Sequence, residues 1–538
     1  MKTPGVYIIE KNAFPNSVVE APTAIPAFIG YTERAVNGND DLTNVPWKIS
    51  SMTEYIQYFG GGPDLKFEVD IKDGSLCIEG KNSYTLYYNM MLFFANGGGA
   101  CYIVSVGSYK DALKKDSMIT GLGKLTLEQE ITLVAIPEAV NLSSSEEFKD
   151  IQQQMLSHCG NTMKNRFALL DIYPKANEKT KIEDQVNFFC DNIGSSFLSY
   201  GAAYFPWLNT SIVGERDLKG DMFTWTDNAY IHRTQLDAGF AEIVESLFVE
   251  EFEIKENVVK NGHTFKLEEV VEGDIYADSD TEKTKVIGRI ESIKDIKEAE
   301  TGKVIKKDVK VVWLFPNNVD KQALHQALYN VSSVYKQAIK GVLKNLNLFP
   351  PSAAMAGIYT MVDNSRGVWK APANVTLNYV GSTVEDIDDE QQAELNVPIH
   401  GKAVNVIRLF RGEGVKVWGA RTLDGNSLDW RYVNVRRTLL FLEESIKNAA
   451  RAYVFEPNDA GTWINMKCMI DSFLRSVWKR GGLAGATPED AFEVHIGLGD
   501  TMTAEDILDG IMRITVLVAV THPAEFIEIT FQQQAQKS

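Results

Sequence analysis

The stretch at residues 419–482 constrains the fold most, because its apolar residues recur with helical spacing on both sides of a turn. The first predicted helix spans about 432–453, with an apolar face formed by Val435, Leu439, Leu442, Ile446, Ala449 and Tyr453. Residues 456–461, Glu-Pro-Asn-Asp-Ala-Gly, favour a turn. Thr462 is then expected to cap a second helix, which ends at Gly481-Gly482. Its predicted apolar face carries Ile464, Met469, Phe473, Leu474 and Val477.

The charge of this helical hairpin differs from that of its surroundings. Residues 401–480 hold 14 Lys/Arg and 8 Asp/Glu, a net charge of +6, in a chain whose net charge is −18. Residues 481–538 hold 2 Lys/Arg and 9 Asp/Glu, a net charge of −7. Adjacent segments of opposite sign suit contacts between copies of one protein. Charge alone, however, favours a solvated hairpin balanced by its own neighbour.

Four tracts resemble the C-terminal half of tail sheath proteins when taken in order. They are Trp418-Gly419-Ala420-Arg421-Thr422-Leu423, the nine residues from Asp429 to Arg437, Phe455-Glu456-Pro457-Asn458 and Pro523-Ala524-Glu525-Phe526-Ile527. Tail sheath proteins form the contractile outer tube of phage tails, R-type pyocins and related contractile injection systems. The resemblance is strongest from about residue 349 onward and weaker through Thr3-Pro4-Gly5-Val6-Tyr7 and residues 204–208. No single tripeptide is specific, but the ordered set is.

The resemblance implies a structural role rather than an enzymatic one. It implies a helical homo-oligomer of stacked six-fold rings around an inner tube protein, with baseplate and terminator or cap proteins and possible sheath paralogues as further partners. Contraction would drive the tube through a target cell envelope without a cofactor. The subunit would assemble in the bacterial cytoplasm and then form part of a phage tail or a released tail-like particle. Neither nucleic-acid binding nor direct membrane insertion is implied.

The predicted fold class is α/β (α+β), in several domains. The resemblance implies that residues 1–22 form an N-terminal linker arm, 23–348 an outward-facing α/β region, 349–515 the sheath core domain and 516–538 a C-terminal strand arm. A charged insert lies at about 241–312, with 18 Asp/Glu and 12 Lys/Arg between residues 241 and 310. Its recurring Val, Ile and Phe favour a β-rich module over a disordered loop. In related sheaths inserted domains face outward.

Secondary structure follows from apolar runs and their flanking residues. Helices are expected at 51–59, 84–96 and 320–346, and a short helix capped by Thr503. Parallel strands are expected near 27–30, 101–106, 133–137 and 167–171. In the C-terminal half, strands are expected at 404–409, 415–418, 492–496, 511–521 and 526–532.

Both ends of the chain carry strand-like residues. The N-terminal arm contains Val6, Tyr7, Ile8 and Ile9, and the C-terminal arm contains Phe526, Ile527, Ile529 and Phe531. A lone terminal strand pairs most often within its own domain. The resemblance instead implies that both arms add strands to the sheets of neighbouring copies. It also implies that the helical hairpin faces the tube, which assigns Arg436, Arg437, Lys479 and Arg480 to contacts with the tube or with adjacent subunits.

Composition and motifs argue against several other classes of protein. The acidic balance disfavours non-specific nucleic-acid binding. Five scattered cysteines without a CxxC pair indicate neither a disulfide framework nor a zinc site and fit a reducing cytoplasm. No apolar signal segment is expected, and the apolar run at 514–520 is too short to span a bilayer.

An enzyme is the alternative hypothesis: a subtilisin-like-fold hydrolase, since part of the sheath family is described as subtilisin-like, or another cytosolic enzyme. The tract 121–126 fails as a phosphate loop, because Leu125 stands where Ser or Thr should bind magnesium. His158-Cys159 are adjacent and should point apart on a helix. Gly194-Ser195-Ser196 matches the Gly-flanked serine of a nucleophile turn poorly. The histidines lack metal-ligand spacing. Fold similarity alone does not carry activity.

Overall fold

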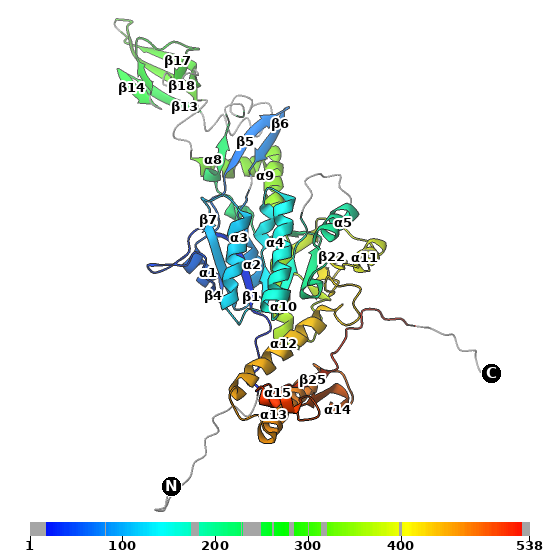
Figure 1. Ribbon diagram of the computed structural model, residues 1–538. Helices are drawn as coiled ribbons and strands as arrows, with labels where there is room; N and C mark the ends of the chain where they lie inside the picture. Colours follow the sequence, from blue (N-terminus) through cyan, green and yellow to red (C-terminus); the bar gives the residue numbers. More distant parts are fainter. Residues whose placement is uncertain are drawn as a thin grey trace, which may run out of the picture. The chain divides into compact units, whose positions relative to one another are not determined.

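The computed structural model describes residues 18–80, 82–173, 182–226, 229, 249–260, 263–278, 285–299, 301–313, 320–397 and 401–529 (Figure 1). The described residues belong to two compact units. The first draws on residues 1–63, 83–212 and 349–538, and the second on residues 64–82 and 213–348. The first unit thus includes parts of the chain from before and after the predicted boundary between residues 348 and 349.

A nine-stranded sheet forms the centre of the first unit within the described residues, in the order β20-β23-β22-β10-β9-β8-β1-β7-β4. Its strands are β1 Pro26–Thr32, β4 Trp47–Ile49, β7 Cys101–Ser108, β8 Leu133–Ala135, β9 Phe167–Leu170, β10 Gly201–Phe205, β20 Val375–Thr376, β22 Val404–Phe410 and β23 Gly414–Val417. The six strands from β22 to β7 pair in parallel, and β4, β23 and β20 are antiparallel to their neighbours. The predicted α/β class is confirmed.

Helices cover both faces of this sheet, as alternating strand residues require (Figure 1). Ile29 packs on one side with α3 Lys115–Lys124, α4 Ser145–Ser157 and α5 Ile182–Asn192. Its neighbour Phe28 packs on the other side with α1 Met52–Phe59, α2 Leu86–Ala95 and α10 Ser352–Arg366. The predicted helices at 51–59 and 84–96 are therefore present, and Ser51 caps α1.

Buried carboxyl groups hold two of these helices at their N-terminal ends. Glu138 accepts three backbone N–H bonds, from Tyr31 at 2.7 Å, Thr85 at 2.7 Å and Leu86 at 3.2 Å. Asp171 accepts from the backbone N–H of Ser352 at 2.9 Å and from its hydroxyl at 2.5 Å. Burial raises the pKa of each carboxyl group to about 7.

The predicted helical hairpin is confirmed as α12 Val433–Ala450 and α13 Ala460–Lys479. Its apolar side packs with an antiparallel pair, β24 Phe492–His495 and β25 Thr515–Val518. Two short helices, α14 Pro488–Ala491 and α15 Ala504–Leu508, flank this pair, and Thr503 caps α15 as predicted. Val433 and Leu440, in the N-terminal half of α12, belong to the hydrophobic cluster that also contains Phe28 of the central sheet. The helix therefore contributes to this cluster and to the one that it shares with α13.

Three details of the hairpin differ from the prediction. Asp459, not Thr462, caps α13, because its Oδ1 accepts the Thr462 N–H at 2.9 Å. Ile464 is 61% exposed, and Met466 lies on the buried face instead. The strand predicted at 511–521 is limited to β25.

The second unit contains the three-stranded sheet β12-β5-β6 and two helices, α8 Lys321–Val331 and α9 Ser333–Leu346. Its strands are β5 Phe67–Lys72, β6 Ser75–Glu79 and β12 Phe223–Trp225. One continuous helix was predicted at 320–346, and this prediction is wrong. Ser332 adopts extended backbone and its hydroxyl accepts the Tyr335 N–H, so it ends α8 and caps α9.

The charged insert is β-rich, as predicted. It forms the sheet β13-β18-β17-β16 and the hairpin β14-β15, around a core that includes Ile254, Phe265, Ile290 and Trp313. The bounds are β13 Val249–Ile254, β14 Asn257–Lys260, β15 His263–Lys266, β16 Ile275–Asp278, β17 Lys285–Lys297 and β18 Val304–Trp313.

The remaining short elements are β2 Val36–Asn37, β3 Asp40–Asp41, β11 Leu208–Thr210, β19 Leu348–Phe349, β21 Val380–Thr383 and α11 Asp389–Asn396. A search of the described helices finds none whose length and apolar content would suit a bilayer crossing.

Candidate functional site

The C-terminal arm residues that the structure describes are exposed. Phe526, Ile527 and Ile529 are 76%, 79% and 70% exposed, and no described residue among 526–529 belongs to a strand. Exposed large apolar side chains in succession are typical of a surface that another chain covers. Val6, Tyr7, Ile8 and Ile9, as well as Phe531, lie outside the described residues. Strand exchange therefore stays a prediction at this point.

The residue immediately before this exposed run is held by several polar partners. The Glu525 carboxylate accepts from Arg421 Nε at 3.0 and 3.2 Å and from Arg421 Nη2 at 2.6 Å. Asn396 Nδ2 donates to it at 2.9 Å, and the Tyr432 hydroxyl donates at 3.1 Å. The Arg421 side chain is 3% exposed and that of Glu525 is 20% exposed. These partners fix the root of the C-terminal arm.

The hydrogen-bond donors around Glu525 stabilise its charged form. Partial burial raises the pKa of the carboxyl group, but hydrogen bonds from Arg421, Asn396 and Tyr432 and the positive charge of Arg421 outweigh it. The net pKa is below its usual range. Glu525 is therefore a carboxylate at neutral pH, and the bond to arginine is charge-assisted.

The root of the N-terminal arm is fixed by a second set of contacts. The Thr23 carbonyl accepts from Thr132 Oγ1 at 2.8 Å and from Arg437 Nη2 at 2.9 Å. The Ala21 N–H donates to Ser445 Oγ at 2.9 Å. Val18, which is 8% exposed, belongs to the hydrophobic cluster of α12 and α13. The chain is thus anchored from Val18 to the start of β1.

Arg437 was predicted to contact the tube or another subunit, but its side chain is buried beside Asp363 of α10. The Nη1–Oδ1 and Nη2–Oδ2 distances are 3.0 and 2.6 Å, and the two side chains are 3% and 0% exposed. Its guanidinium also lies 4.7 Å from the centre of the Tyr359 ring. Arg437 therefore has partners within its own chain, and its contact with another chain stays a prediction.

Arg436 is buried in a different way. Its guanidinium stacks between the rings of Tyr200 and Trp430, at 3.8 and 4.5 Å from their centres. Burial lowers the pKa of this group. Its predicted contact with a tube or a neighbouring copy also stays a prediction.

The other two predicted contact residues lie at the end of α13 and are exposed. Arg480 forms a bidentate ion pair with Glu20, in which Nη1 and Oε2 are 3.2 Å apart. Lys479 has no ion pair with any described residue. Lys467 and Arg475 are also exposed on α13. The surface of this helix thus offers positive charge to a partner.

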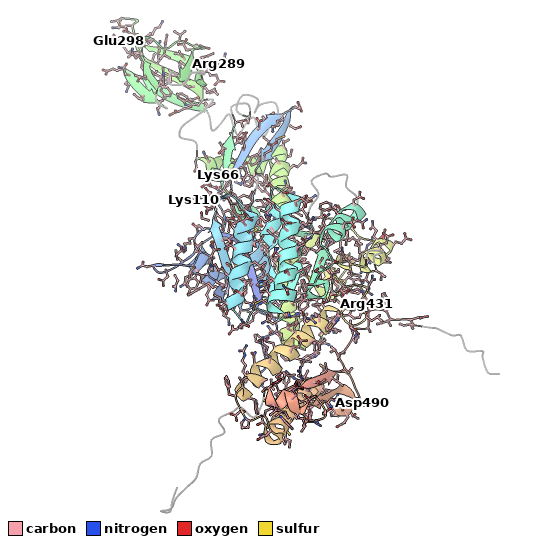
Figure 2. All side chains as sticks on the ribbon, in the orientation of Figure 1. Lys66, Lys110, Arg289, Glu298, Arg431 and Asp490 are labelled. Carbon is pink, nitrogen blue, oxygen red and sulfur yellow. The ribbon has the colours of Figure 1, made fainter. Side chains whose placement is uncertain are left out.

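The small sheet lies within the acidic segment that follows α13. Figure 2 labels Asp490 in α14 and Arg431 just before α12, one residue from each oppositely charged segment. The sheet itself has two strands in the described part of the chain, and each leaves one edge without a ladder partner there. A two-stranded sheet with free edges is a template for an added strand.

The residue patterns weighed for enzymatic chemistry have other roles in the fold. The tract 121–126 lies in α3 and the turn after it. His158 Nε2 lies 2.9 Å from Arg166 Nη1, and burial together with this arginine lowers its pKa to about 4. Burial raises the pKa of Cys159 to about 12, which disfavours a thiolate. No metal-ligand cluster occurs among the described residues.

Comparison with known proteins adds the family context. Residues 426–534 match the phage tail sheath C-terminal domain. The tail sheath protein of Vibrio phage KVP40 is 25% identical over 134 residues, which are 25% of this chain and 20% of the relative. A putative prophage major tail sheath protein of Pseudomonas aeruginosa is 29% identical over 100 residues, which are 18% of this chain and 25% of the relative. The aligned segments thus span a fifth to a quarter of these relatives.

Solved structures match over nearly the whole chain. One is a sheath complex in the contracted state from an extracellular contractile injection system, PVC, with 25% identity, a TM-score of 0.55 and coverage of 99% of this chain and 98% of the other. Another is the six-fold symmetrised baseplate of the anti-feeding prophage, AFP, with 25% identity, a TM-score of 0.56 and coverage of 99% of each chain. The chain is similar to tail sheath proteins. The resemblance stated from the sequence is confirmed.

Sequence reasoning named the exposed arm residues but missed the residues that hold their roots. Arg421 and Glu525 both lie in the tracts that carried the resemblance, yet 104 residues separate them. Nothing in their spacing indicates that they meet. Their ion pair depends on the tertiary fold.

Proposed function

We propose that this chain is the structural subunit of a contractile sheath that polymerises helically around an inner tube. The observation that carries the proposal is the similarity, over nearly the whole chain, to a sheath complex in a contracted state. Sheath contraction would drive the tube through a target cell envelope. The exposed C-terminal arm and the open edges of β24 and β25 support this function, since they suit a protein that is completed by its neighbours.

Subunits would be linked by strand exchange through both arms. Val6 to Ile9 of one copy and residues 526–531 of another would extend the β24–β25 sheet of a neighbour. Such a contact is heterologous, so it propagates as a helix rather than closing on itself. Stacked six-fold rings, with a baseplate at one end and a terminator at the other, fit the baseplate assembly that one similar structure belongs to. Sheath paralogues could occupy equivalent positions.

The exposed cations of α13 are the proposed contacts with the tube or with the acidic segment of an adjacent copy. Lys479 and Arg480 lie at the exposed end of the helix, which supports this role, and of the two only Arg480 pairs with a described residue, Glu20. Arg436 and Arg437 would first have to leave partners inside the chain. We therefore expect charge reversal at Lys479 to weaken co-assembly with the tube more selectively than substitution of either buried arginine.

The energy for contraction would come from the difference in free energy between two packings of the same subunits, not from a bound nucleotide. The subunits would assemble in the bacterial cytoplasm as a metastable extended sheath, which is then part of a phage tail or a tail-like particle. We propose no catalytic role, because the proteins that this chain resembles are structural. The alternative of a subtilisin-like-fold hydrolase finds no support among these comparisons.

Electron microscopy of the purified protein tests the proposal. The wild-type chain should form long tubes, and a variant lacking residues 1–17 should remain monomeric while it keeps the anchored residues from Val18 onward. Charge reversal Lys479→Glu tests the surface contact separately. If Lys479 contacts the inner tube protein, the variant should still form sheath tubes but bind the inner tube protein less; if it contacts an adjacent copy, the variant should form fewer sheath tubes. A wild-type protein that stays monomeric and labels with a fluorophosphonate would overturn the sheath function in favour of a hydrolase.

A further inference from the structure

The contacts around Glu525 mark a boundary in the C-terminal part of the chain. Before it, the Ala519 N–H donates to the Ala491 carbonyl at 2.8 Å, and the Ala519 carbonyl accepts from the Ala484 N–H at 2.7 Å. The Thr521 carbonyl accepts from Asn434 Nδ2 at 3.0 Å. After it, the apolar side chains from Phe526 onward are exposed. Glu525 is the last residue with polar contacts to the body of the subunit in the described part of the chain.

The partner of Glu525 is itself held rigidly. The Arg421 N–H donates to Asn405 Oδ1 at 2.7 Å, and its carbonyl accepts from Asn405 Nδ2 at 2.7 Å. Asn405 belongs to β22 and also donates to the Ala203 carbonyl of β10 at 3.2 Å. Arg421 Nη1 donates to the Asn396 carbonyl at 2.9 Å. The guanidinium therefore stands at a fixed place relative to the central sheet.

The bonding geometry is specific for an arginine and a carboxylate. The Nε and Nη2 groups of Arg421 together reach both oxygens of Glu525 in a planar fork, whereas the single nitrogen of a lysine ammonium offers no such fixed pair of donors. Tyr432 and Asn396 each add a donor from a different element. Four donor groups thus hold one carboxylate in one orientation, and this also fixes the direction in which residue 526 leaves.

We propose that Arg421 and Glu525 are positioning residues that fix the exit point of the C-terminal arm, so that the exposed segment from Phe526 onward is presented to a neighbouring subunit from one place and in one direction. The inference rests on the proposed strand exchange and adds the residues that orient it. A segment whose root is fixed searches fewer orientations before it pairs, so less conformational entropy is lost on assembly.

The test compares two carboxylate substitutions, one at the root of the arm and one far from it. Glu525→Gln keeps the size of the side chain and removes its charge. Glu268→Gln removes an equal charge from an exposed position of the charged insert, outside both arms. For each variant, hydrogen exchange of the monomer at residues 519–526 and the mass of sedimentable sheath are measured. We expect Glu525→Gln to raise exchange about ten-fold or more and to lower sheath mass about ten-fold or more, as loss of a charge-assisted hydrogen bond implies. Glu268→Gln should match the wild type in both.

The outcomes separate this inference from the proposed function. Sheath mass equal in the two variants would overturn the positioning role while leaving the sheath function intact. A wild-type chain that forms no sheath would overturn both. If Glu525→Gln unfolds, Tyr432→Phe removes only one hydroxyl donor to the carboxylate. That variant should fold and show a smaller rise in exchange with a partial loss of sheath, and wild-type values for both would also overturn the inference.

Discussion

Replacing Arg437 with methionine should destabilise the first unit strongly, because it leaves a buried carboxylate without its cation. The Asp363 side chain is fully buried, and both of its oxygens accept from Arg437. Removing one partner of a buried ion pair costs about 3–5 kcal/mol of unfolding free energy. The variant also loses the bond that Arg437 donates to the Thr23 carbonyl.

The double variant Asp363→Leu/Arg437→Met supplies the matched control. It replaces the pair with apolar side chains, which is often neutral or stabilising because no charge is left buried. We therefore expect the double variant to be more stable than Arg437→Met alone. Lys479→Met, at an exposed position, should change the free energy by less than about 0.5 kcal/mol.

Native-state hydrogen exchange of the α12 amides is the suitable assay, because it reports local free energy in the first unit independently of the second. The monomeric variant lacking residues 1–17 is the background, so that polymerisation does not contribute. A loss below about 1 kcal/mol for Arg437→Met, or a double variant as unstable as the single one, would refute the reasoning that the pair is a buried element of the fold.

Two further predictions concern an arm residue and a buried carboxyl group. Ile527→Asp should leave the unfolding free energy of the monomer within about 0.5 kcal/mol, since Ile527 is 79% exposed, but should sharply reduce sedimentable sheath; Leu127→Asp, at an 81% exposed position, is the control and should assemble normally. Burial raises the pKa of Glu138 in the folded chain to about 7, above its ordinary value of about 4.5, so the folded chain holds its proton more tightly than the unfolded chain. Its contribution to stability should be largest below about pH 4.5 and fall as the pH rises to about 7, so the difference in unfolding free energy between wild type and Glu138→Gln should change across this range. A difference that is constant with pH would contradict this prediction.

The sequence predicted most helices and strands because their signals are local. Ser51 and Thr503 cap the expected helices, and five of the six parallel strands of the central sheet, β1, β7, β8, β9 and β22, fall on expected apolar runs. The sixth, β10, was not predicted as a strand. The errors have local causes too. Both Asp459 and Thr462 are residues that can cap a helix, and the one that caps α13 is Asp459. Ser332 ends one helix and caps the next, although the apolar pattern continues on both sides of it.

The surroundings of α12 could not be predicted from its periodicity. A helical pattern indicates one apolar face, whereas α12 packs against the central sheet on one side and against α13 on another. Arg436 and Arg437 are buried for this reason, whereas the sequence analysis assigned them to contacts with another chain. Their partners, Tyr200 and Asp363, come from distant parts of the chain. The sheet order likewise places β22 beside β10, some two hundred residues earlier.

The two arm roots reach the central sheet at different strands. Thr23 lies just before β1 and bonds to Thr132 beside β8, whereas Arg421 connects Glu525 to Asn405 of β22. In the sheet, β10, β9 and β8 lie between β22 and β1. If neighbours pull on both arms of a subunit during contraction, the tension would cross this row of parallel strands from one side to the other. The tensile strength of the sheath would then depend on hydrogen bonds at the centre of each subunit, far along the chain from the ends that join one copy to the next.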